Sequence, residues 1–173
     1  MYRILRTVVL ATLLFPCMAH AQKIKEVTIK KGKESVPAFC LKIKESKAVT
    51  QKVLKQEQQD AGLKKGKHKK GFTVHKGVVW PYISSTKMDY WYKVKGNRRK
   101  STVYFVVSKG YDNYVSGSND FNTASSVNTF LSRLEEQVEN QKDIDDKQAE
   151  LDKIDKKKAK KEKQLEKLKD KQQ

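Results

Sequence analysis

The amino-acid sequence predicts an α+β fold, a two-layer sandwich in which two helices cover one face of a roughly five-stranded antiparallel sheet. Three observations support this expectation. Five short segments alternate between apolar and polar residues, two longer segments repeat apolar residues at helical spacing, and neighbouring strands are joined by short connections. The expected order of elements is strand, strand, helix, three strands, helix (ββαβββα).

The first two expected strands form a hairpin. Residues alternate in polarity over 26–30 and again over 36–44, and the sequence Lys31-Gly32-Lys33 supplies the turn between them. In the second strand, alternation places Phe39, Leu41 and Ile43 on one face and Cys40 on the other.

A helix is expected to follow over residues 46–61. Ser46 can cap its amino end, because a serine hydroxyl accepts a hydrogen bond from a free N–H group of the first turn. Gly62 after Ala61 is typical of a left-handed helix stop. The apolar stripe of this helix comprises Val49, Val53 and Leu54.

Three further strands are expected before the last helix. The first covers residues 72–83, where Gly77 and Pro81 indicate a bulge and an edge position. Residues 88–94 and 102–108 then form a second hairpin across a basic turn.

The last helix is expected to begin within residues 123–126 and to pack on the sheet up to Val138. Its apolar residues recur at i, i+3, i+4, i+7 and i+11, the spacing of a helix that covers a sheet. This stripe comprises Val127, Phe130, Leu131, Leu134 and Val138.

Composition divides the chain into a head at residues 22–141 and a tail at residues 142–173. The tail contains no aromatic residue and no glycine, and 21 of its 32 residues are charged. A helical tail would extend roughly 50 Å beyond the head. With Ile144 at heptad position a, lysines interrupt the a and d positions, so a symmetric coiled coil is expected to be poor. A solvated helix, a partner helix and a polyanion-binding arm are the alternatives.

Residues 1–21 have the pattern of a cleaved export signal. Arg3 and Arg6 precede the apolar run 7–15, and the small-x-small sequence 19–21 precedes Gln22. A retained membrane anchor is the alternative, although the apolar run is short for a spanning helix. Pro16 argues against lipid attachment at Cys17. The expected location is the periplasm or, failing that, the exterior of the cell, with no transmembrane span after processing.

The chain is strongly basic, with a formal net charge of +18 that falls to +16 when residues 1–21 are removed. In an exported protein this charge predicts contact with anionic envelope polymers or a lipid surface, whereas nucleic acid is a poor candidate. The alternative is that the lysines serve only solubility. The candidate anion-contacting residues form two clusters: Lys64, Lys65, Lys67, Lys69 and Lys70, and Lys93, Lys95, Arg98, Arg99 and Lys100.

No enzyme, metal or cofactor motif is present in the sequence. Cys40 is the one cysteine after residue 21, and we expect an inert strand residue rather than a nucleophile or an intermolecular disulfide. His68 and His75 lack a third zinc ligand, and His75 is expected to face solvent, opposite Phe72 and Val74.

Two groups of aromatic residues are further candidates for ligand contact. Trp80, Tyr82 and residues 90–92 could stack on sugars, although alternation predicts that about half of them lie in the core. A polar connection with aromatic residues joins the last strand to the last helix and could bind a ligand or simply link the two elements. Its candidate residues are Tyr111, Asp112, Asn113, Tyr114, Asn119 and Asp120.

Taken together, residues 19–22, residues 103–114 and the tail resemble small exported proteins of Gram-negative bacteria with a lysine-rich helical end. This resemblance implies location and architecture but no active residues. The chain is also similar to basic periplasmic holdase chaperones of the Skp type, although their helical arms are inserted between strands and this tail is terminal. We therefore expect a non-enzymatic envelope binding or interaction protein, contacting an anionic component or an unidentified envelope protein. A chaperone-like oligomer formed through the tail is the alternative, and an enzyme is the third hypothesis.

Overall fold

The structure, a computed structural model, describes residues 24–169. The predicted signal at residues 1–21 lies outside the described residues. Neither helix between residues 24 and 169 has the length and apolar character needed to cross a membrane. The elements in chain order are β1 (Ile24–Lys31), β2 (Glu34–Ile43), α1 (Lys47–Asp60), β3 (Lys67–Lys69), β4 (Phe72–Trp80), β5 (Ser84–Gly96), β6 (Ser101–Ser108) and α2 (Phe121–Lys169).

The described strands form one antiparallel sheet in the order β1-β2-β6-β5-β4-β3. This confirms the predicted α+β class, but the sheet has six strands and not five. The additional strand is β3, in which Lys67 pairs with Val74 and Lys69 with Phe72 of β4. Its sequence Lys-His-Lys has no apolar residue, so alternation of polarity could not reveal it.

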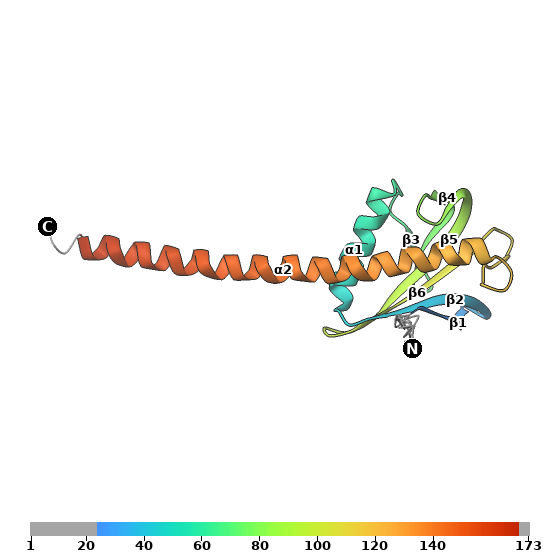
Figure 1. Cartoon of the computed structure of the whole chain (residues 1–173), viewed down its shortest axis with the longest axis horizontal. Coiled ribbons are helices and arrows are strands. Elements are labelled where there is room, and N and C mark those ends of the chain that lie inside the picture. The colour runs from blue at the N-terminus through green and yellow to red at the C-terminus, as the bar shows by residue number, and fades with distance from the viewer. Residues whose placement is uncertain (1–23, 170–173) are drawn as a thin grey trace, which may run out of the picture.

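Both helices pack against the same face of the sheet (Figure 1). Trp80 is fully buried at the centre of this core, with its ring centroid 5.5 Å from that of Phe105 and 5.2 Å from that of Phe130. The predicted stripe of α2 from Val127 to Val138 is buried throughout, and α1 contributes Val53 and Leu54.

A second apolar cluster lies on the opposite face and contains strand residues but no helix residue. The pairing of β2 with β6 ends at Phe39, so the first half of β2 is free to turn toward β4 and β5. A Cβ atom on Gly32 would lie 2.6 Å from Lys70 Nζ, which places the β1–β2 turn beside the β3–β4 turn. Because β1 and β3 lie at opposite edges, the sheet must be strongly curved. The buried members of this cluster are Val36, Ala38, Phe72, Val74, Trp91 and Val106.

The strand predicted over 72–83 is shorter than expected. It ends at Trp80, whose carbonyl accepts a 2.8 Å hydrogen bond from the Ile83 N–H, and β5 begins at Ser84 instead of Met88. The predicted bulge is present, since the register of β4 against β5 shifts between His75 and Val78 and again between Val78 and Trp80.

The first helix has the predicted ends. The Ser46 hydroxyl accepts a 3.2 Å hydrogen bond from the Val49 N–H, as expected of a cap. At the other end, Gly62 has φ +69 and the Leu63 N–H donates to the Gln58 carbonyl at 2.8 Å. This pattern matches the left-handed stop that the sequence predicts.

The second helix begins earlier than predicted and continues without interruption into the tail. It starts at Phe121, because the Asp120 carboxylate accepts a 3.2 Å hydrogen bond from the Thr123 N–H. Beyond the head it extends as a single rod (Figure 1). Its first exposed turns still touch the head, through ion pairs of Lys142 with Glu45 at 3.3 Å and of Asp145 with Lys52 at 2.8 Å.

Candidate functional site

The first basic cluster surrounds the short strand β3. Lys64 and Lys65 lie in the connection from α1, Lys67 and Lys69 lie on β3, and Lys70 lies in the turn to β4. All five are exposed. The chain adopts a left-handed conformation at Lys70, with φ +51, and at the following Gly71, with φ +77, which reverses its direction within two residues.

The second basic cluster lies at the end of the β5–β6 hairpin. Arg98, Arg99 and Lys100 are exposed in the turn, where the Asn97 side-chain oxygen accepts hydrogen bonds from the Arg99 N–H at 2.9 Å and the Lys100 N–H at 3.2 Å. The Lys47 N–H donates to the Asn97 carbonyl at 2.9 Å, so this turn is tied to the start of α1.

The two β5 lysines of this cluster lie on the sheet face opposite the helices. The Lys93 ammonium lies 4.4 Å from the centroid of the Phe72 ring and 5.3 Å from that of Tyr104, whose ring also lies 6.0 Å from the Lys95 ammonium. Burial, with a smaller contribution from the Lys95 charge, lowers the pKa of Lys93. Lys93 therefore packs along the sheet instead of extending into solvent.

A groove between α1 and the strands β4 and β5 is lined in part by the first basic cluster. We call this hollow of about 610 Å³ the α1 groove. It contains Lys65 of the first cluster and the neighbouring His68. Lys93 of the second cluster also lines it, although the Lys93 ammonium lies over Phe72 on the opposite face of the sheet. Its lining has no Asp or Glu residue. The lining residues are Lys47, Gln51, Leu54, Lys55, Gln58, Gln59, Leu63, Lys65, Gly66, His68, Gly71, Thr73, Tyr92, Lys93 and Val94.

Three lysine ammonium groups are available at the α1 groove, those of Lys47, Lys55 and Lys65. None of them forms an ion pair with another residue of the described part of the chain, whereas Lys52 on the same helix pairs with Asp145. The groove was not evident from the sequence, because Lys47 and Lys55 lie outside both basic clusters. The packing of α1 against the sheet brings them to the same groove as Lys65.

The floor of the α1 groove is polar, and some of its hydrogen-bonding groups already have partners within the protein. The Gln58 side-chain amide donates to the Tyr92 hydroxyl at 2.6 Å and to the Leu54 carbonyl at 2.8 Å. Burial raises the pKa of Tyr92, so its hydroxyl stays protonated at neutral pH. Gln51 and Gln59 add amide groups that are exposed to solvent. Lysine, amide and hydroxyl groups together suit an anionic ligand that also carries hydroxyl groups.

A second hollow, of about 710 Å³, lies along β4 on the other side of the α1–β3 connection. It is lined by Lys64, Lys65, Lys67, Lys69 and Lys76 together with apolar residues, and it contains His75. The prediction that His75 faces solvent is wrong, because only 5% of its surface is exposed. Both faces of β4 are covered: Phe72 and Val74 pack in the second cluster, and His75 stacks on Tyr92 at 6.2 Å.

The environment of His75 disfavours its charged form. Burial lowers the pKa of His75, and its Nε2 atom has no hydrogen-bond partner within residues 24–169. A Cβ atom on Gly66 would lie 2.7 Å from this nitrogen, so the α1–β3 connection lies directly over the ring. His68 is exposed on β3. Across residues 24–169 there is no group of three or more His, Cys, Asp or Glu side chains that could hold a metal ion.

Sequence reasoning missed a lysine held between aromatic rings and carboxylates. The Lys31 ammonium lies 4.3 Å from the Trp91 ring centroid and 4.6 Å from the Tyr114 ring centroid. It also donates a hydrogen bond to the Tyr114 hydroxyl and lies 3.6 Å from Glu34 and 3.9 Å from Asp112. Burial, followed by the acidic neighbours, raises the pKa of Tyr114. The five residues come from three separate segments, the β1–β2 hairpin, β5 and the loop before α2, so no local motif could have revealed the cluster.

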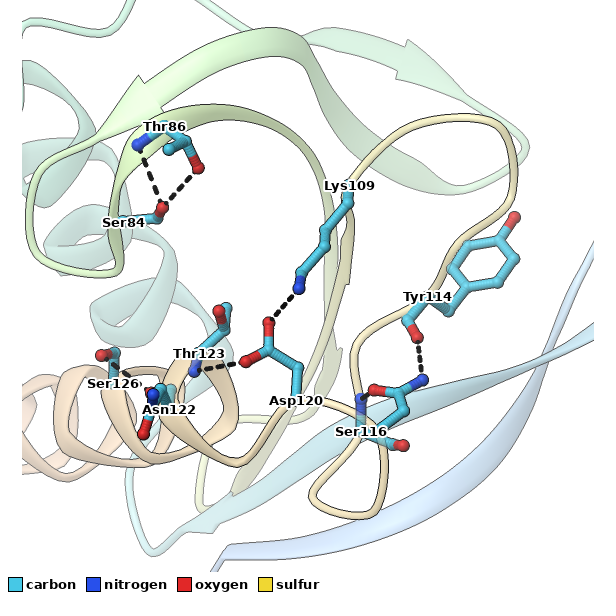
Figure 2. A network of polar contacts seen from close by, with 10 residues as sticks. Ser84, Thr86, Lys109, Tyr114, Ser116, Asp120, Asn122, Thr123 and Ser126 are labelled. Atoms are coloured by element: carbon cyan, nitrogen blue, oxygen red, sulfur yellow. Dashed lines mark hydrogen bonds and ion pairs between the residues drawn. The ribbon is translucent and has the colours of Figure 1, made fainter.

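The predicted ligand loop uses most of its polar groups internally. Asp120 pairs with Lys109 at 2.8 Å and caps α2 through Thr123, as Figure 2 shows. The two bonds, led by the one from Lys109, hold the pKa of Asp120 near 2. The Asn119 side chain accepts from the Ser116 N–H at 2.9 Å and donates to the Tyr114 carbonyl at 2.7 Å.

The rest of that loop makes a tight turn. The Asn113 N–H donates to the Gly110 carbonyl at 3.0 Å, and its carbonyl accepts from the Lys109 N–H at 2.9 Å. Asp112 accepts a 2.9 Å hydrogen bond from the Tyr114 hydroxyl. Tyr111 is fully exposed and, like Asp112, has a positive φ angle. Of the two candidate tyrosines, Tyr111 is fully exposed and Tyr114 is half-buried.

The aromatic residues proposed for stacking are almost all in the core. Trp80, Tyr90, Trp91 and Tyr92 are buried, which exceeds the predicted half. Tyr82 is 41% exposed, and the Arg133 guanidinium lies 3.8 Å from its ring centroid. Arg133 also pairs with the buried Glu57 of α1. These contacts join the two helices to the turn before β5.

Cys40 is a buried free thiol on the face predicted for it, and burial raises its pKa. A raised pKa keeps the thiol protonated at neutral pH, which is unfavourable for a nucleophile.

Comparison with known proteins adds no further information about the site. No protein-family model matches the chain, and no match was found among curated proteins or among solved structures.

Proposed function

We propose that this chain is a non-enzymatic, envelope-associated binding protein that contacts an anionic polymer through the α1 groove. The observation that carries the proposal is the lining of that groove, where Lys47, Lys55 and Lys65 form no ion pair with another described residue and no carboxylate lines the hollow. A groove lined by one sign of charge concentrates ligands of the opposite sign. The export pattern of residues 1–21 supports a location where such polymers are abundant.

The chemistry of the groove favours a phosphorylated or carboxylated saccharide. Lysine binds phosphate as a compact point charge, and glutamine amides bond to sugar hydroxyls as donors and acceptors. None of the aliphatic residues that line the groove is fully exposed, since Leu54 and Val94 are buried and Leu63 is half-buried. We therefore place the anionic saccharide ahead of a lipid surface, which would be expected to meet exposed apolar side chains.

Direct binding measurements test this proposal. A phosphorylated core oligosaccharide freed of lipid is titrated into the protein at low and at physiological salt, and phosphatidylglycerol vesicles are tested in parallel. We expect binding to the oligosaccharide that weakens as salt shortens the Debye length from about 30 Å at 0.01 M to about 8 Å at 0.15 M. Absence of binding at low salt would refute the proposal, and binding only to vesicles would assign the groove to lipid headgroups.

A charge-matched pair of variants tests the location of the site. Replacement of Lys47, Lys55 and Lys65 by glutamine should weaken oligosaccharide binding about tenfold or more, since each lysine near an anionic surface contributes roughly 1 kcal/mol. The control replaces Lys25, Lys30 and Lys33 of the β1–β2 hairpin, which are all exposed, and should change the affinity less than threefold. Equal losses in the two variants would mean that net charge, and not the α1 groove, binds the polymer.

A further inference from the structure

The part of α2 beyond the head presents a row of exposed apolar residues. Ile144, Leu151 and Ile154 are 60%, 53% and 59% exposed, although aliphatic side chains of this size are usually buried. Their spacings of seven and three residues place them on one face of the helix. Asp145 and Gln141 face α1 and the head, so the head leaves the face of Ile144 free.

Parallel pairing of two such helices is unfavourable. Heptad positions a and d are occupied in turn by Ile144, Lys147, Leu151, Ile154, Lys158, Lys161, Leu165 and Leu168. In a parallel pair each residue meets its own copy, so three layers of the core would each contain two lysines. Like charges would also face one another outside the core, because the acidic part of one helix would lie along the acidic part of the other.

Antiparallel pairing removes both conflicts. When two copies cross with residue 156 at the centre, each a position meets a d position of the other helix. The layers are then Ile144 with Leu168, Lys147 with Leu165, Leu151 with Lys161, and Ile154 with Lys158, each occurring twice. No layer contains two lysines. Each lysine can lay its aliphatic stem on an apolar partner and keep its ammonium in water.

The distribution of charge along the tail also favours the antiparallel arrangement. Residues 143–155 contain six acidic and two basic side chains, whereas residues 156–169 contain eight basic and two acidic side chains. Antiparallel crossing places the acidic part of each copy along the basic part of the other. The helix is continuous through both parts, so the whole charge pattern lies on one rod.

We propose that the tail binds a second copy of the chain as an antiparallel helix pair over residues 144–168. The overlap is about 36 Å long, at 1.5 Å per residue. It places the two heads at opposite ends of the rod. If the proposed function is correct, one dimer carries two α1 grooves that point to separate sites on a polymer, and the second contact gains from an increased effective concentration.

Sedimentation of the full chain tests the association itself. We expect a monomer–dimer equilibrium whose dimer fraction falls as salt is raised. The double variant Leu151→Asp and Ile154→Asp should be monomeric, and the control Ala149→Asp, which lies on the outer face of the helix, should still dimerise. Circular dichroism of each variant establishes that the head remains folded. A chain that is monomeric at every concentration, or that forms a trimer, would overturn the proposal.

Disulfide trapping tests the orientation. Ile154→Cys and Lys158→Cys are introduced separately into a chain in which Cys17 and Cys40 are replaced by alanine, and the two proteins are mixed under mild oxidation. An antiparallel pair brings position 154 next to position 158 and should give mainly the mixed disulfide. Predominance of the two homodisulfides would show parallel pairing and refute the proposal.

Different results would refute the proposed function and the proposed dimer. The α1 groove variant should dimerise like the unmodified chain, because its three lysines are outside residues 144–168. The tail variant should bind a short oligosaccharide with unchanged affinity but lose the gain seen with a long polymer. Loss of oligosaccharide binding with the dimer intact would overturn only the proposed function, and loss of the dimer with binding intact would overturn only this inference.

Discussion

At the scale of single residues, His75 is the clearest case in which burial controls chemistry. Its ring lies between Tyr92, Trp80 and the connection that carries Gly66, and no acidic group of residues 24–169 offsets the cost of a buried charge. The pKa of His75 is therefore lower in the native state than in the unfolded chain, where the ring is not buried.

This difference predicts an acid-dependent loss of stability. Below the ordinary histidine pKa of about 6.5, the unfolded chain binds a proton that the native state does not bind at this site. The free energy of unfolding should then fall by up to about 1.4 kcal/mol per pH unit, until the pH reaches the lowered pKa of His75 in the folded protein. Urea titrations at pH 7 and pH 5 measure the effect.

His75→Phe should reduce this pH dependence, because phenylalanine retains the stacking on Tyr92 without a titratable group. The control His68→Gln alters an exposed histidine and should leave the pH dependence unchanged. An identical pH dependence in His75→Phe and in the unmodified chain would contradict the prediction.

At the scale of secondary-structure elements, α2 is one continuous helix with two different surroundings. Up to Val138 its apolar side chains are buried against the sheet, and from Ile144 its apolar side chains are exposed. The same element therefore seals the core of the head and then extends from it as an arm (Figure 1).

Two leucines on α2 should differ sharply in their contribution to stability. Leu134 is fully buried, so Leu134→Ala should lower the free energy of unfolding of the head by about 2–5 kcal/mol. Leu151 is 53% exposed, so Leu151→Ala should have little effect on the head. Tryptophan fluorescence during urea titration follows the head, because Trp80 and Trp91 both lie there. Equal effects of the two substitutions would mean that α2 does not pack on the sheet.

At the scale of the whole molecule, the head should be stable without the arm. Truncation after Gln141 removes the ion pairs of Lys142 with Glu45 and of Asp145 with Lys52. Both pairs lie at the surface, with at least one partner exposed to solvent, and surface pairs contribute little. We expect a thermal midpoint close to that of the full chain and complete loss of the dimer. Truncation after Arg133, which also removes Leu134 and Val138, should unfold the head and serves as the comparison. A large loss of stability on truncation after Gln141 would show that the arm supports the head.

Much of the fold was predictable from local sequence patterns. Ser46 and Gly62 mark the ends of α1, Gly77 marks the bulge in β4, and the stripe from Val127 to Val138 identifies the packed part of α2. Each of these features depends on hydrogen bonds or on periodicity within a few neighbouring residues, and such local patterns can be read from the sequence.

By itself, then, the sequence determined the α+β class, the hairpins, both helices and the positive charge. The tertiary structure alone decided which charges gather at one place. Curvature of the sheet joins Lys31, Trp91 and Tyr114, and the packing of α1 brings Lys47 and Lys55 to the same groove as Lys65. The tertiary structure also decided that His75 is buried, because both faces of β4 are covered. It made β3 a strand, because β3 gains its hydrogen bonds from β4. Contacts between segments distant in sequence leave no periodic signal, since they depend on how the sheet curves and where the helices pack.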